Sequence, residues 1–127
     1  MKTYSPATVA APAGPYSHGV EIPGDARLLY LAGQIGVSPD GTMSADFEAQ
    51  ADQCWKNIKA ILAAAGMGVE HLVKCTHFLT SPEHVAAYGK VRTRHLGEAR
   101  PASTLLVISA LARPGMLVEV EAIAAKG

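Results

Sequence analysis

The hydrophobic period changes near residue 70, and this change constrains the fold more than any other feature of the sequence. From Ser44 to Ala65 the apolar side chains recur at helical spacing, which predicts an amphipathic helix. Ser44 is placed to cap the helix start, Asp46 lies in the first turn, and Gly66 supplies a left-handed stop. The apolar positions are Phe47, Ala51, Cys54, Trp55, Ile58, Ile61, Leu62 and Ala65.

From Val73 to Thr80 the period falls to two, which predicts a strand with alternating faces. Val73, Cys75, His77 and Leu79 share one face of this strand. The other face carries Lys74, Thr76, Phe78 and Thr80.

A second helix is predicted directly after this strand. Ser81, Pro82 and Glu83 are a cap, a first-turn proline and a carboxylate that suits the helix dipole. Val85, Tyr88 and Val91 give the helix a narrow apolar stripe that ends before Gly97. We expect Lys90, Arg92 and Arg94 on its solvated face.

The remaining apolar segments are short and bounded by Gly, Pro or Asp, as is typical of strands. They lie near Thr3 and at Ser17–Ile22, Leu28–Ala32, Ser103–Ser109 and Met116–Ala124. Gly24–Asp25 suggests a hairpin, and Ser38–Thr42 (SPDGT) has the residues of a tight turn. The order β-β-β-α-β-α-β-β predicts an α+β fold, with both helices on one sheet face and identical subunits covering the other.

The composition favours a small protein that buries apolar surface between subunits. The 127 residues are 49% hydrophobic and only 17% charged, and we expect a single domain over residues 1–127. Eleven basic and eleven acidic residues give a formal net charge of zero, so no broad field gathers nucleic acid or anionic lipid.

The cysteines and the N-terminal segment indicate a cytoplasmic protein. Cys54 and Cys75 fall within the predicted helix and strand, where we expect reduced core thiols rather than a disulfide. Pro12 and Pro15 interrupt the N-terminal segment before an apolar stretch of signal-peptide length, and no segment approaches a membrane span.

Five short motifs carry a resemblance to a known family. They are PAGPYSHG (Pro12–Gly19), LAGQIGV (Leu31–Val37), NIKAIL (Asn57–Leu62), VKCTHFL (Val73–Leu79) and VEVEAIA (Val118–Ala124). Their order and spacing resemble the RidA (YjgF) family over nearly the whole chain. The resemblance implies a chorismate-mutase-like fold assembled as a homotrimer, with ligand pockets in the three clefts between adjacent subunits.

The family's deaminases hydrolyse a reactive imine or enamine to a keto acid and ammonia without a metal or organic cofactor. Their arginine, two residues after the proline matching Pro101, clamps the substrate carboxylate; that position is Ser103 here. A serine hydroxyl carries no charge, so a charge-assisted contact on the order of 1.5–3 kcal/mol is lost. The family's pocket cysteine, pocket serine and helix asparagine correspond to Leu105, Ala32 and Gly89, which makes the pocket more apolar.

Three residues match the family's pocket, namely Tyr16, Gly33 and Glu119, the last if the preceding loop holds one extra residue. The resemblance implies that Tyr16 shapes the pocket, the Gly33 backbone lines it, and Glu119 positions the hydrolytic water. Without the resemblance, Tyr16 would be a packing residue with a wet hydroxyl. Glu119 and Glu121 would then be two solvated carboxylates on one strand face.

Other polar residues are weaker candidates. Arg100 is either a displaced anion anchor or a solvated surface residue. His18 follows Tyr16 closely and is expected near the cleft, whereas His77 is expected to be a hydrogen-bonded structural histidine. Ser103 has no histidine near it in sequence, so acyl transfer has no support. No residues have metal-ligand spacing, and we expect neither metal nor cofactor.

Three functions remain in order of preference. The first is a homotrimeric hydrolase of a small imine, enamine or related electrophile, with Glu119 activating water and a substrate lacking the usual carboxylate. The second is a non-catalytic module of the same fold that holds a small metabolite between Ser103, Leu105 and Tyr16. The third, an endoribonuclease, has little support because the chain has neither a basic surface nor stacked aromatics.

Overall fold

The computed structural model describes residues 1–127, and its elements follow the predicted order. The strands are β1 (Lys2–Tyr4), β2 (Gly19–Glu21), β3 (Arg27–Ile35), β4 (Leu72–Leu79), β5 (Ala102–Val107) and β6 (Val118–Lys126). The helices are α1 (Phe47–Ala64) and α2 (Val85–Leu96), with short 3-10 turns η1 (Val69–His71) and η2 (Pro82–His84).

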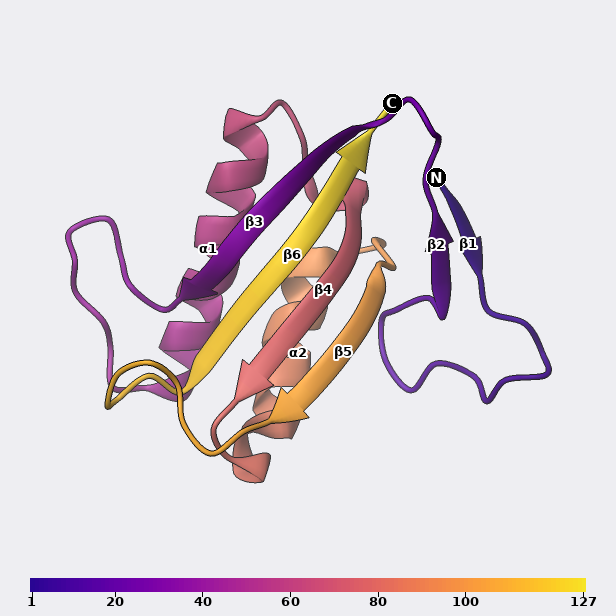
Figure 1. Ribbon diagram of the computed structural model, residues 1–127. Helices are drawn as coiled ribbons and strands as arrows, with labels where there is room; N and C mark the ends of the chain where they lie inside the picture. The colour runs from indigo at the N-terminus through magenta and orange to yellow at the C-terminus, as the bar shows by residue number, and fades with distance from the viewer.

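The main sheet has four strands in the order β3-β6-β4-β5 (Figure 1). Strand β6 runs antiparallel to both neighbours, whereas β4 and β5 are parallel and are joined through α2. Both helices lie behind the sheet in Figure 1, so one face is covered and the other is open. This arrangement confirms the predicted α+β layer.

Strands β1 and β2 form a separate antiparallel ribbon, in which Lys2 pairs with Glu21 and Tyr4 with Gly19. The hairpin predicted across Gly24–Asp25 is therefore wrong, although the chain does turn there. The cause lies just before β2, where Ser17 bridges to Ala102 at the start of β5. Because β3 is at the opposite edge of the sheet, β2 cannot pair with it.

The start of α1 differs slightly from the prediction. Asp46, and not Ser44, is the N-cap: its carboxylate accepts a hydrogen bond from the Ala49 N–H at 2.9 Å. The Ser44 hydroxyl instead accepts from the Asp46 N–H at 3.0 Å, so it supports the capping residue.

The predicted helix ends and the SPDGT turn are confirmed. Gly66 at φ 71° ends α1, and Gly41 at φ 86° takes the left-handed position of the SPDGT turn. Ser81 accepts a hydrogen bond from the Glu83 N–H at 3.2 Å before α2, and Gly97 follows the last residue of that helix.

The hydrophobic core lies between the two helices and the covered face of the sheet. Its large side chains are Trp55, Ile58, Leu62, Tyr88, Val91, Leu79, Val118 and Val120. Cys54 and Cys75 are free and buried in this core, as predicted. Burial raises the pKa of each thiol to about 12, so both remain protonated and unreactive at neutral pH.

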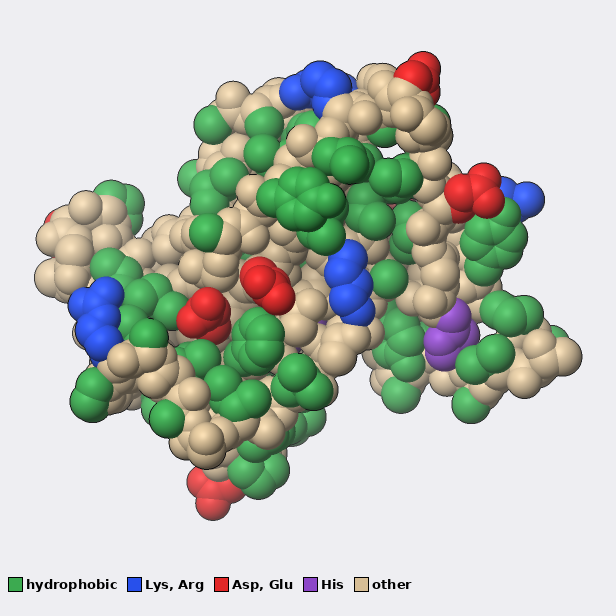
Figure 2. Space-filling model, viewed as in Figure 1, with side chains coloured by type: hydrophobic (Ala, Val, Ile, Leu, Met, Phe, Trp, Pro, Cys, Tyr) green, Lys and Arg blue, Asp and Glu red, His purple; other side chains and the backbone are tan.

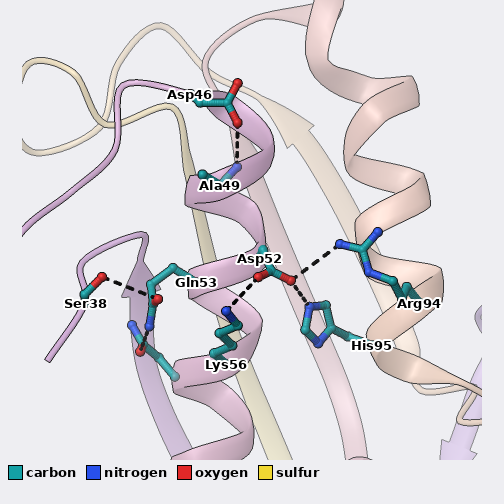
Figure 3. A network of polar contacts seen from close by, with 9 residues as sticks. Ser38, Asp46, Ala49, Asp52, Gln53, Lys56, Arg94 and His95 are labelled. Atoms are coloured by element: carbon teal, nitrogen blue, oxygen red, sulfur yellow. Dashed lines mark hydrogen bonds and ion pairs between the residues drawn. The ribbon is translucent and has the colours of Figure 1, made fainter.

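A polar network around Asp52 joins the two helices (Figure 3). The Asp52 carboxylate lies 2.6 Å from Nε2 of His95, 3.1 Å from Nζ of Lys56 and 3.5 Å from a terminal nitrogen of Arg94. The hydrogen bond from His95 lowers the pKa of Asp52 to about 2, against the opposing effect of burial. The network therefore fixes the orientation of α2 relative to α1.

The open face of the sheet is apolar at its margins. Leu28, Leu106 and Tyr30 are exposed, and Tyr30 is 71% accessible. Figure 2 looks onto this face and shows hydrophobic side chains around acidic ones. A small hollow of about 150 Å³ lies among residues that include Lys74 and Glu121. No helix of the structure has the length and apolar character needed to cross a membrane.

Candidate functional site

The candidate site residues on the open face lie where β3 and β6 pair. Ile35 pairs with Glu119, and the register shifts between Leu31 and Gln34. This irregularity brings the Gly33 backbone directly beneath the Glu119 side chain: a Cβ on Gly33 would lie 1.9 Å from a carboxylate oxygen of Glu119. A side chain at position 33 would therefore displace the carboxylate.

Glu119 is half-buried and pairs with no basic side chain of the chain. Ala32, next to Gly33, is exposed, and its carbonyl accepts a hydrogen bond from the Gln34 amide at 3.1 Å. The predicted residues Ala32, Gly33 and Glu119 thus form one cluster. The Glu119 carboxylate of this cluster has no ion-pair partner in the chain.

Ser103 belongs to a second cluster, on the covered face of the sheet. Its Oγ lies 2.9 Å from Nε2 of His77, because β4 and β5 are parallel neighbours whose side chains point toward the helices. The Nδ1 of His77 is hydrogen-bonded to the hydroxyl of Tyr88, and that hydroxyl accepts the Trp55 indole N–H at 3.2 Å. Four polar side chains therefore form a continuous chain.

The direction of these hydrogen bonds follows from the donors available. The Trp55 indole can only donate, so the Tyr88 oxygen accepts from it and gives its single hydrogen to Nδ1 of His77. The neutral imidazole then carries its proton on Nε2 and donates it to Ser103. Consequently the Ser103 hydroxyl hydrogen is free to point at a ligand, and His77 cannot remove it as a general base.

Burial keeps the hydrogen-bonded side chains of this cluster uncharged. It lowers the pKa of His77 to about 3, with smaller contributions from the positive charges of Arg92 and Lys74. It also raises the pKa of Tyr88 far above its usual value. His77 is 1% exposed with both ring nitrogens bonded, which confirms the predicted structural histidine. The contact of this histidine with Ser103 was not predicted, because the two residues are 26 positions apart in the sequence.

The two clusters lie on opposite faces of the sheet within one chain. Phe78 is the register partner of Glu119, and the next pair along is His77 with Val120. Since side chains alternate across a strand, Glu119 points to the open face and His77 to the helices. The predicted residues Glu119 and Ser103 are therefore not brought together by a single chain.

Tyr16 lies beside the Ser103 strand. The next residue, Ser17, donates its N–H to the Pro101 carbonyl at 3.1 Å and its hydroxyl to the Arg100 carbonyl at 2.7 Å. The Tyr16 hydroxyl accepts the Ala13 N–H at 3.3 Å within its own loop. Its ring meets the ring of His18 edge-on with centroids 5.7 Å apart, so His18 is close to Tyr16 as expected.

Two further predicted residues lie nearby. The Arg100 guanidinium donates to the carbonyls of Gly97 and Ala99, both at 2.8 Å, and the residue is exposed. In this geometry the Arg100 guanidinium is held by backbone carbonyls at the surface of the chain. Leu105 is partly buried and packs against the core beside the Ser103 cluster.

Arg92 is a residue whose environment the sequence analysis predicted wrongly. It is half-buried rather than on the solvated face, because it lies one helical turn after Tyr88 on the inner side of α2. Its guanidinium carbon is 5.7 Å from the centre of the Tyr88 ring. No group of three or more His, Cys, Asp and Glu residues is arranged to hold a metal ion.

A mixed four-stranded sheet covered by two helices on one face is the architecture of the chorismate-mutase-like α+β proteins. Residues 7–126 match the family model described as Endoribonuclease L-PSP. The chain is 40% identical to Protein DfrA of Myxococcus xanthus over 114 residues, which is 87% of this chain and 85% of that protein. It is 33% identical to the 2-iminobutanoate/2-iminopropanoate deaminase of Mus musculus over 124 residues, covering 94% and 89% of the two chains.

Solved structures agree with this assignment. The Rid-family protein YyfB from Yersinia pestis superposes with a TM-score of 0.87 at 29% identity, over 98% of both chains. E. coli TdcF with bound serine superposes with a TM-score of 0.75 at 29% identity, over the full length of both. The chain therefore belongs to the RidA/YjgF (L-PSP) family.

Proposed function

We propose that this protein hydrolyses a small imine, enamine or related electrophile in a pocket formed between subunits, with Glu119 as the base that activates water. The observation that carries the proposal is the unpaired Glu119 carboxylate lying against the Gly33 backbone. An acceptor in this position can take a proton from water as the water adds to the C=N carbon. Returning that proton to nitrogen gives a carbinolamine. Transfer of the carbinolamine's hydroxyl proton to nitrogen through the same carboxylate then lets the C–N bond break, so a carbonyl product and ammonia leave.

The assembly we propose is a homotrimer. The open sheet face carries exposed Leu28, Tyr30 and Leu106, which favours burial against a second copy. Glu119 and Ser103 lie on opposite faces of one chain, so a pocket holding both would use one residue from each of two subunits. Tyr16 would shape the pocket from the β5 side.

The identity of residue 103 argues against a typical 2-imino acid deaminase. Ser103 stands where the family resemblance places the carboxylate-binding arginine, and its neutral partner His77 adds no charge. The mouse relative is named for two 2-imino acids and the TdcF structure holds serine, which supports a small amino-acid-derived ligand in this family. We infer that this protein holds such a ligand without a charged group at position 103.

A second candidate function is a non-catalytic module that binds a neutral metabolite. The Ser103 hydroxyl, which His77 leaves able to donate, and the apolar Leu105 favour this alternative. An endoribonuclease remains the third candidate, despite the description of the family model, because the net charge of the chain is zero.

Ammonia release from freshly generated 2-iminobutyrate and 2-aminoacrylate tests the proposal. Wild type, Ser103→Arg and Glu119→Gln should be compared, with the oligomeric state checked by light scattering. We expect little wild-type turnover, a gain in Ser103→Arg, and loss of all turnover in Glu119→Gln without loss of assembly. Turnover unchanged by Glu119→Gln would reject the role of Glu119.

A further inference from the structure

Arg92 carries a positive charge that no acidic group of the chain neutralises. The ion pairs of the structure involve Asp52 and Glu70, and none includes Arg92. Its Nε is inaccessible to solvent and has no hydrogen-bond partner. A partly desolvated guanidinium without a counter-ion is costly, and an anion at its terminal nitrogens would offset that cost.

Three contacts place Arg92 at the same edge of the fold as Ser103. A terminal nitrogen of Arg92 lies 3.1 Å from where a Gly14 Cβ would be, so the guanidinium touches the loop before Tyr16. That loop continues to Ser17, which bridges to Ala102 beside Ser103. From the helix side, the Tyr88 ring packs against Arg92 and its hydroxyl bonds the His77 that holds Ser103.

The surface beside Arg92 is a basic groove of about 630 Å³ between α2 and the Ala13–Pro15 loop. Lys90, Arg92, Thr93 and Arg94 line it, and no acidic residue does. Gly14 and Gly89 contribute no side chain, and a Cβ on Gly89 would lie 3.9 Å from the Arg92 terminal nitrogen. The two glycines therefore leave the guanidinium uncovered on its groove side.

We propose that Arg92 is the anion-recognition residue of this protein and binds the carboxylate of a small organic acid in the groove between α2 and the Ala13–Pro15 loop. The claim that the bound carboxylate belongs to the substrate rests on the proposed function. The claim that Arg92 binds a carboxylate does not. Guanidinium recognises a carboxylate through paired, charge-assisted hydrogen bonds. The charge thus comes from α2, through Arg92 in the lining of the groove.

Calorimetric titration of the 127-residue protein with 2-oxobutyrate, near neutral pH, tests the proposal. We expect saturable binding by wild type, weaker binding of the methyl ester of the same acid, and a loss of about tenfold or more in affinity for Arg92→Gln. Arg113→Gln removes the same charge from an exposed loop and should leave the affinity unchanged. Failure of wild type to bind 2-oxobutyrate, or equal affinity in Arg92→Gln, would overturn the proposal.

A second pair of variants keeps the test informative if Arg92→Gln does not fold. Gly89→Asp places a carboxylate beside the guanidinium and should block 2-oxobutyrate binding by forming an internal ion pair. Gly89→Asn has the same shape without the charge, so it is the control for filling the groove, and it should bind 2-oxobutyrate more tightly than Gly89→Asp. Equal binding by the Asp and Asn variants would also reject Arg92 as the anion site.

Glu119→Gln separates this inference from the proposed function. If that variant loses turnover but still binds 2-oxobutyrate in an Arg92-dependent manner, both proposals hold. Arg92-dependent binding by a wild-type protein with no hydrolytic activity on any imine would retain the anion site and reject the hydrolase. Turnover that depends on Glu119 but not on Arg92 would retain the hydrolase and reject the anion site.

Discussion

The Oγ of Ser103 lies 2.9 Å from Nε2 of His77, although the two residues are 26 positions apart in the sequence. The pairing resembles a nucleophile and its base, but the buried hydroxyl of Tyr88 already donates to the other imidazole nitrogen. The remaining ring proton points at Ser103, so the histidine orients the serine instead of activating it. Ser103 is therefore held as a hydrogen-bond donor toward whatever ligand approaches β5.

Removing the His77 imidazole should destabilise the fold. In His77→Phe the buried Tyr88 hydroxyl loses its acceptor, and we expect the free energy of unfolding to fall by about 1–3 kcal/mol. Ser103→Ala removes only the half-exposed end of this series of hydrogen bonds and should lower the free energy of unfolding by less. Urea denaturation at one fixed protein concentration measures both. A His77→Phe variant as stable as wild type would contradict the buried hydrogen-bonded chain.

Stability should fall as the pH is lowered from about 6.5 toward 4. The pKa of His77 is about 3 in the folded protein and about 6.5 when unfolded, so the unfolded chain binds more protons in this range. Stability therefore rises with pH, by at most about 1.4 kcal/mol per pH unit from this residue. Burial also lowers the pKa of His95, with an effect of the same sign. In His77→Phe, denaturation measured across this range should show a shallower slope; an unchanged slope would contradict the assignment.

A side chain at position 33 should abolish any hydrolysis that depends on Glu119. Gly33→Ala places a Cβ 1.9 Å from the present carboxylate position, so the carboxylate must move. A shift of this size is expected to lower turnover by roughly a hundredfold. Gly24→Ala is the matched control, because its Cβ would meet nothing within 4 Å. Ammonia-release assays on the two substitutions, each made in the Ser103→Arg background, should therefore differ, and equal rates would remove Gly33 from the site.

The Asp52 network should contribute to stability mainly through His95. In Asp52→Ala the largely buried His95 ring loses the acceptor of its Nε2, and we expect a loss of about 1–2 kcal/mol. Lys56→Ala breaks an exposed pair and should cost less than about 0.5 kcal/mol. Denaturant unfolding distinguishes the two variants. If both lost the same stability, the helix–helix role of His95 would be wrong.

Local patterns in the sequence were sufficient for most of the fold. The helical spacing before Gly66 and the alternation after it predicted α1 and β4. A helix or strand that is buried on one side has apolar residues that recur at its own period. Two of these predictions were wrong, one for the N-cap of α1 and one for the partner of β2, because two nearby residues or strands could each fill the same role. Asp46 caps α1 although Ser44 is also a capping residue, and β2 pairs with β1 because Ser17 is fixed at β5.

For the candidate site, the sequence by itself determined which side chains are present and, by resemblance, which family the chain belongs to. Ser103, Glu119 and Gly33 could all be named from their motifs. Only the tertiary structure decided what they touch: the parallel register of β4 and β5 brings His77 to Ser103, and strand alternation separates Ser103 from Glu119. Arg92 lies half-buried against Tyr88 and Gly14 for the same reason. These contacts join residues far apart in the chain, so no local period records them.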